Sequence, residues 1–156
     1  MQLCRLVYYS TYNISSLAND VTADFEQILA SAIRSNSESG LTGGLISDRQ
    51  FFAQVLEGDQ GAVMETFARI HEDHRHKHIV VAGKKQVRER LFGAWSMGYA
   101  GNMELFKTIC AEFGHAGPFD PTHMSGSHLT AFILALVTRE ENFAPSRKGA
   151  GTLADA

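Results

Sequence analysis

The sequence is poor in cysteine, in net charge and in long apolar runs. Its 156 residues include two cysteines, too few for a disulfide framework, so a reduced and cytoplasmic setting is expected. The net charge of -3 argues against a general attraction to nucleic acid or to a membrane surface. The longest apolar run, residues 131–137, is far too short to cross a bilayer. Residues 1–5 also lack the basic and then apolar pattern of a signal peptide.

Recognisable catalytic motifs are missing as well. The sequence contains no Gly-x-Ser-x-Gly elbow, no P-loop and no dinucleotide fingerprint. Four histidines between residues 71 and 78 raise the alternative of a metal site. We favour a solvated turn there, because the interleaved Arg75 and Lys77 would repel a cation and no cysteine lies nearby. We therefore expect neither an enzyme nor a metal centre.

What is present is the composition of one globular domain, with 44% hydrophobic and 20% charged residues. Apolar periodicity predicts helices around 25–33 and 63–70. It also predicts strands at 3–10, 41–47, 51–58, 79–82 and 94–99. The resulting order, β-α-β-β-α-β-β, is that of an α+β, ferredoxin-like sheet with one added strand.

The predicted core strands are apolar on both faces, so both faces of the sheet need cover. We expect the first two helices on one face and C-terminal helices, near 103–113 and 129–137, on the other. By this division, residues 1–100 form the core domain and 101–140 form a helical cap. Residues 141–156 are polar and small, which predicts a disordered tail.

Gln54 is the most unusual residue of the predicted core. Strand alternation puts it on the same face as Phe52 and Leu56, and a buried primary amide costs free energy unless both its C=O and its NH2 find partners. Tyr8 and Asn36 are predicted to point into the same space, between the sheet and the first two helices. These three side chains could simply bond each other or the backbone.

Taken together, however, the three polar groups suit a flat heterocycle with imide C=O and N–H edges. Ile28 and Ile70, one on each of the first two helices, could sandwich such a ring. The ring would then explain why an apolar face carries a tyrosine, an asparagine and a glutamine.

The chain resembles BLUF domains, the flavin-binding sensors of blue light, over residues 2–100. The matching stretches are Arg5-Leu6-Val7-Tyr8-Tyr9-Ser10, Asn36 with Gly40-Leu41-Thr42-Gly43, Phe52-Ala53-Gln54-Val55-Leu56-Glu57-Gly58 and Trp95-Ser96-Met97. The resemblance makes residues 1–100 a flavin-binding domain. It implies FAD as the usual flavin, although the residues are equally compatible with FMN or riboflavin.

The resemblance also implies roles for individual residues. Tyr8 matches the tyrosine that donates an electron, coupled to a proton, to the photoexcited flavin. Gln54 matches the glutamine whose amide light rearranges, and Asn36 matches the residue that holds the imide edge. The residues that match the ring-flanking and phosphate-side positions are Ile28, Ile70, Arg69, Arg75 and His76. Ser35 departs from the family, whose members often carry a longer polar or basic side chain there.

Trp95 and Met97 lie two apart on a short predicted strand, so we expect their side chains to face the same side. Ordinary core packing would explain them, but the resemblance makes this strand the output element. It implies a blue-light photoreceptor that signals through its C-terminal helices to a separate partner protein, with homo-oligomers possible. The rivals are a ferredoxin-like ligand-binding or assembly module without photochemistry and, last, a flavin enzyme.

Overall fold

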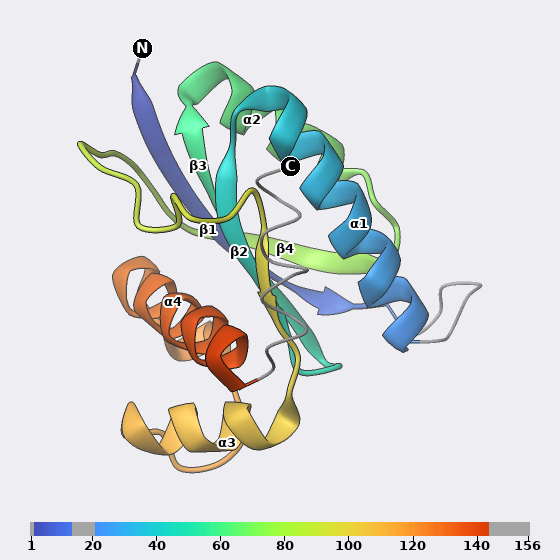
Figure 1. Ribbon diagram of the computed structural model, residues 1–156. Helices are drawn as coiled ribbons and strands as arrows, with labels where there is room; N and C mark the ends of the chain where they lie inside the picture. The colour runs from blue at the N-terminus through green and yellow to red at the C-terminus, as the bar shows by residue number, and fades with distance from the viewer. Residues whose placement is uncertain (1, 14–20, 144–156) are drawn as a thin grey trace.

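The computed structural model describes residues 2–13 and 21–143 (Figure 1). The elements, in chain order, are β1 Leu3–Tyr12, α1 Val21–Ser39, β2 Thr42–Ser47, β3 Phe51–Asp59, α2 Gln60–His71, β4 His76–Gln86, β5 Gly98–Ala100, α3 Met103–Glu112, a 3-10 turn Pro121–His123 and α4 Gly126–Phe143. This order confirms the predicted β-α-β-β-α-β-β, ferredoxin-like α+β fold. None of the helices in the described parts of the chain combines the length and apolar character needed to span a bilayer.

The five strands form one sheet in the order β4-β1-β3-β2-β5. All neighbours are antiparallel except β2 and β5, which run parallel. The central pair, β1 and β3, places Tyr8 directly opposite Gln54. A tight turn joins β2 to β3, where Asp48 Oδ1 accepts the Phe51 N–H at 2.8 Å. The two residues that matter most to the site therefore come from the two best-embedded strands.

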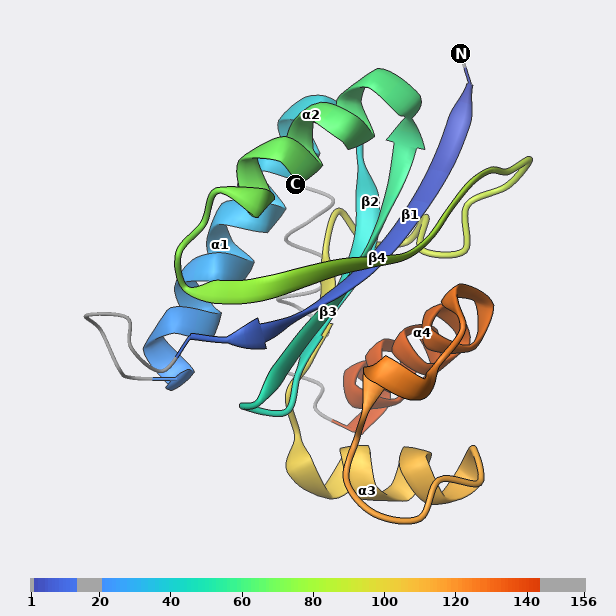
Figure 2. The same ribbon diagram turned by 180° about the vertical axis from the view of Figure 1, so that it is seen from behind.

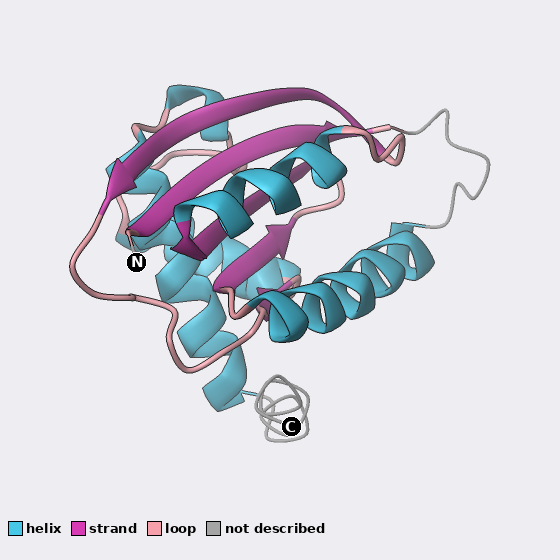
Figure 3. Ribbon diagram, turned by 90° about the horizontal axis from the view of Figure 1, so that it is seen from above, coloured by secondary structure: helices cyan, strands magenta, loops and turns pink. Residues whose placement is uncertain are grey.

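Helices cover both faces of the sheet, as predicted. Figures 1 and 2 show α1 and α2 on one side and α3 and α4 on the other. Figure 3 shows the strands and helices from above, coloured by type. Because side chains alternate along β1 and β3, each strand contributes residues to two separate hydrophobic cores, one on each face of the sheet. Tyr8 and Leu56 belong to the core beneath α1 and α2, whereas Val7 and Val55 belong to the core beneath α3 and α4.

The prediction for Trp95 and Met97 was wrong. The fifth strand begins only at Gly98, so both residues lie in the bend before it, where strand alternation does not apply. Hydrogen bonds from Trp95 N to Phe92 O at 3.1 Å and from Gly43 N to Trp95 O at 3.3 Å hold that bend. As a result Trp95 packs into the α3/α4 core and Met97 into the α1/α2 core, on opposite sides of the sheet.

Two predicted segments are longer than expected. β4 starts at His76 rather than residue 79, so part of the expected histidine turn is strand, paired through its backbone with β1. α4 runs from Gly126 to Phe143, three residues into the range expected to be a tail. Buried Glu140 anchors the helix there, accepting the Asn102 N–H at 2.9 Å. Residues 144–156 of the expected tail lie outside the described residues.

Candidate functional site

A cavity of about 210 Å³ lies between the sheet and helices α1 and α2. All the residues that the sequence nominated for cofactor binding line it: Tyr8, Ile28, Asn36, Gln54, Arg69, Ile70, Arg75 and His76. Its volume is below the roughly 300–1,000 Å³ of a typical pocket for a drug-sized ligand. A drug-sized or larger ligand would therefore fit only in part inside the cavity, with the remainder outside its mouth.

Tyr8 and Gln54 form the polar centre of the cavity wall. The Tyr8 hydroxyl donates to Gln54 Oε1 at 2.5 Å, and the two residues are only 2% and 3% exposed. Burial raises the pKa of Tyr8 far above its ordinary value, so the phenol keeps its proton. Gln54 Nε2 lies 3.8 Å from Met97 Sδ, a weak acceptor. The amide thus has a strong partner at its oxygen and a weak one at its nitrogen.

Asn36 carries an unmet acceptor. Its Nδ2 donates to the backbone oxygen of Ser96 at 2.8 Å, which ties α1 to the bend between Trp95 and Met97. Its Oδ1 is buried and has no hydrogen-bond partner among the described residues. A buried unpaired acceptor is costly and rare. The imide N–H of a flavin ring is a donor of the required kind, so the residues present fit a flavin.

The mouth of the cavity is basic, but its charges are already engaged. Arg75 makes a two-pronged ion pair with Asp73, with Nε to Oδ1 at 3.0 Å and Nη2 to Oδ2 at 2.6 Å. Burial of Asp73 acts to raise its pKa, yet the hydrogen bonds from Arg75 outweigh this and lower it. Arg69 Nη2 donates to the Ser35 hydroxyl at 2.8 Å. Of the two arginines, Arg69 keeps more of its guanidinium available for an anionic tail.

His76 is held in the cavity wall by hydrogen bonds at both of its ring nitrogens. Its Nδ1 lies 2.6 Å from Ser10 Oγ and its Nε2 lies 2.8 Å from the backbone oxygen of Ile70. The carbonyl accepts from Nε2–H, which assigns the neutral tautomer in which Nδ1 accepts from Ser10. Burial lowers the pKa of His76 and so favours that neutral form. The ring joins β4 to the end of α2.

Sequence reasoning missed several residues that line the cavity, namely Ser31, Ala32, Leu45, Thr66 and Asp73. Asp73 had a detectable signal, because an acidic residue two positions before Arg75 can pair with it across a turn. The small residues of α1 had none, since Ser31 and Ala32 show only that the helix presents little bulk there. Within the parts of the chain that the structure describes, no group of three or more potential metal ligands comes together.

Known proteins share both the sequence pattern and the fold. Photoactivated adenylate cyclase subunit alpha of Euglena gracilis is 34% identical over 94 residues, which is 60% of this chain but only 9% of that protein. The structure of BlsA in its photo-activated state is 30% identical, with 86% of this chain and 94% of that chain covered and a TM-score of 0.76. BlrB, described as a BLUF protein in its dark state, is 29% identical, with 86% and 96% covered and a TM-score of 0.67.

The family model of BLUF, sensors of blue-light using FAD, matches residues 3–98. That range covers both strands of the Tyr8–Gln54 pair and the helix that carries Asn36. It ends just after Met97, so it also covers the bend that contacts Gln54. The match covers more than half of the chain, and the chain belongs to the BLUF family.

Proposed function

We propose that this chain is a blue-light photoreceptor that holds a flavin, FAD by the family's description, in the cavity between the sheet and helices α1 and α2. The observation that carries the proposal is the buried hydrogen bond from Tyr8 to Gln54 on the cavity wall. It places a redox-active phenol beside an amide whose polarity can be reversed, which is the pair that the proposed photochemistry needs.

The chain's own residues would hold the ring on three sides. Asn36 Oδ1, unpaired among the described residues, would accept the imide N–H. Ile28 and Ile70 line the cavity from α1 and α2 and would flank the ring. Arg69, at the mouth, would attract the phosphates of FAD as a fork of N–H donors.

The bound flavin supplies an excited state, reached by blue light, that accepts an electron. Tyr8 is the donor, and its hydroxyl proton has an acceptor already in place in Gln54 Oε1. Because burial keeps Tyr8 protonated in the dark, the phenol would lose its proton as well as an electron, and Gln54 Oε1 is placed to accept that proton. The Gln54 amide then rotates or tautomerises, which exchanges donor for acceptor without moving the backbone. Return of the electron and the proton to Tyr8 would restore the neutral phenol.

The rearranged amide would act on the bend that precedes β5. Gln54 Nε2 now points at Met97 Sδ, so a reversal of the amide removes that contact. Asn36 holds the Ser96 backbone next to it, and Trp95 continues into the α3/α4 core. Met97 and Trp95 therefore form the proposed output element, and the C-terminal helices respond.

We infer a sensor that signals by contact with a separate protein. The match to the Euglena cyclase covers only 9% of that protein, so its catalytic activity is not part of the proposal. A cytoplasmic location is supported by the two cysteines, Cys4 and Cys110, which are buried and unpaired.

The test is an absorption spectrum before and after blue light. The purified or flavin-reconstituted protein should be yellow, and its flavin band should shift reversibly and slightly to longer wavelength. A colourless protein after reconstitution would overturn the proposal. A bound flavin with no reversible shift would instead favour the alternative, a ligand-binding module without photochemistry.

A further inference from the structure

A second cavity, of about 420 Å³, lies on the other face of the sheet, where β1 and β4 meet the start of α4. We call it the α4 groove. Its apolar lining includes Val7, Ala82, Leu91 and Leu134, and Leu91 is 47% exposed at its rim. None of the residues that line the flavin cavity lines the α4 groove. It is therefore a separate feature of the molecule.

The polar side of the α4 groove is basic. Arg5 and Lys85 are partners in the register of β1 and β4, so their side chains share the α4 face of the sheet. Arg5 uses Nε and Nη2 for Glu57 and Glu89, which leaves Nη1 without a bond among the described residues. Lys85 has no ion-pair partner there either. No acidic side chain of the described residues lines the groove.

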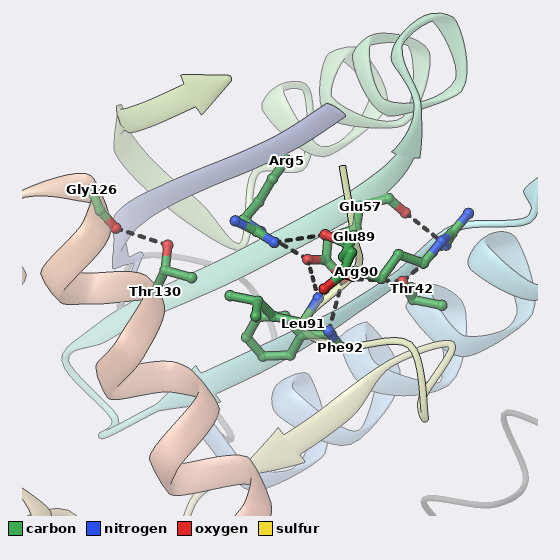
Figure 4. Close-up of polar contacts among 9 residues, drawn as sticks. All are labelled: Arg5, Thr42, Glu57, Glu89, Arg90, Leu91, Phe92, Gly126 and Thr130. Atoms are coloured by element: carbon green, nitrogen blue, oxygen red, sulfur yellow. Dashed lines mark hydrogen bonds and ion pairs between the residues drawn. The ribbon is translucent and has the colours of Figure 1, made fainter. Parts of the chain in front are cut away.

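The first turn of α4 adds to this positive end. Gly126 packs tightly on β4, because a Cβ there would come within 2.7 Å of Ala82 O. Ser125 Oγ accepts the His128 N–H at 3.1 Å, while the first N–H groups of a helix have no acceptor within the helix and favour negative charge. Figure 4 shows Arg5 between this turn, at Gly126 and Thr130, and the loop that carries Glu89 and Leu91.

We propose that the α4 groove is the docking site for an extended acidic segment of a partner protein. A carboxylate of that segment pairs with Arg5 Nη1 and Lys85 beside the first turn of α4. A neighbouring aliphatic side chain packs on Val7, Ala82 and Leu134. The inference deepens the proposed function and rests on it for one point, that the docked protein is the recipient of the light signal.

Charge and lining favour a peptide over a polyanion. The net charge of -3 opposes the approach of a large polyanion, such as nucleic acid or an anionic membrane, more than that of a short segment with one or two carboxylates. The groove offers a small cluster of cations next to an apolar wall, and a lone phosphate backbone would leave that wall uncovered. A segment with alternating acidic and aliphatic side chains satisfies both parts.

Hydrogen bonds also connect the α4 groove to the loop that leads into the bend before β5. Arg5 Nη2 donates to Glu89 O at 3.1 Å, and the carboxylate of Glu57 accepts the N–H groups of Leu91 and Phe92, each at 2.8 Å. Arg5 and Glu57 thus fix the loop that leads into Trp95. A carboxylate that approaches Arg5 acts on the same loop, so occupancy and light can influence each other.

To test this, a displayed random peptide library is selected for binding to the flavin-loaded protein in the dark. Enriched peptides should pair Asp or Glu with Leu, Ile or Val. One enriched peptide is then titrated by fluorescence anisotropy at about 0.15 M salt, where distant charges are screened. Lys85→Glu should weaken binding at least tenfold. Lys77→Glu makes the same charge change at an exposed position of the same strand but outside the groove lining, and should weaken binding less than twofold.

Several outcomes would overturn the proposal. One is a library that enriches no acidic peptides. Another is an equal loss of peptide affinity in the two variants. A third is that a single-stranded oligonucleotide or phosphatidylserine vesicles bind as tightly as the peptide and depend on Lys85 in the same way. Failure of the proposed function is recognised separately, by the absence of bound flavin or of a light-induced shift. Peptide binding is measured in the dark, and Lys85→Glu should leave the flavin spectrum unchanged.

Discussion

Replacing Gln54 with leucine should abolish the light-induced shift while flavin still binds. Asn36, Ile28 and Ile70 line the cavity independently of Gln54, so the proposed ring would keep its other contacts. What the variant loses is the acceptor for the Tyr8 proton and the amide nitrogen that contacts Met97. The photochemical and binding roles of the cavity are therefore separable by this one change.

The effect on stability follows from the burial of Tyr8. Leucine fills most of the volume of glutamine, so no large cavity forms, but the Tyr8 hydroxyl is left unpaired in a residue that is 2% exposed. An unpaired buried hydroxyl costs about 1–3 kcal/mol. Adding Tyr8→Phe removes that hydroxyl and should recover most of the loss. The two changes should therefore be non-additive, with a coupling of about 1 kcal/mol or more.

The assays are light-minus-dark absorption spectra and urea unfolding of wild type, the two single variants and the double variant. Gln50→Leu, an exposed residue in the β2–β3 turn, is the matched control and should keep the full photocycle. A Gln54→Leu protein with a complete reversible shift would refute the proposed mechanism even with flavin bound. Additive losses would show that Tyr8 and Gln54 are not energetically paired.

Other perturbations test the remaining contacts. Asn36→Ala should weaken flavin binding by about tenfold or more, measured by flavin fluorescence, because the ring loses an acceptor worth about 1–2 kcal/mol; unchanged affinity would contradict its role. Glu57→Gln should lower the free energy of unfolding by about 3–5 kcal/mol, since buried Arg5 keeps an uncompensated charge, whereas exposed Glu26→Gln should change it by less than about 0.5 kcal/mol. Burial lowers the pKa of His76, so as the pH falls the unfolded chain takes up a proton at this residue before the folded chain does. The stability that neutral His76 contributes is therefore complete above about pH 6.5 and is lost as the pH falls through the pKa of His76 in the folded protein. Urea midpoints should therefore drop more on acidification in wild type than in His76→Gln, and equal drops would remove His76 as the cause.

The sequence predicted the cavity well because regular strands carry its centre. Along β1 and β3 the side chains alternate without interruption at Tyr8 and Gln54, so their shared face can be read from spacing. Asn36 and Ile28 follow helical spacing on α1 in the same way. Cavity residues on regular elements are therefore readable, even though the register that sets Tyr8 opposite Gln54 is a tertiary property.

Local pattern failed where long-range hydrogen bonds decide the conformation. Gly43 and Asn36, more than fifty residues earlier in the chain, hold the backbone of Trp95 and Ser96, and nothing in residues 94–97 reveals this. Strand β4 was underestimated for another reason. It is an edge strand whose Lys84 and Lys85 are exposed, so pairing with β1 rather than hydrophobic pattern determines its length.

Between Trp95 and Met97 the chain passes from one side of the sheet to the other, which couples the two sides. Met97 contacts Gln54 on one side, and two residues away Trp95 belongs to the core that α4 completes on the other. Thermodynamic linkage between two sites is reciprocal. A partner on the α4 side that binds the illuminated arrangement more tightly must, by the same factor, shift the balance at Gln54 toward that arrangement. If the proposed flavin and partner both bind, the colour of the flavin would then report whether the partner is bound.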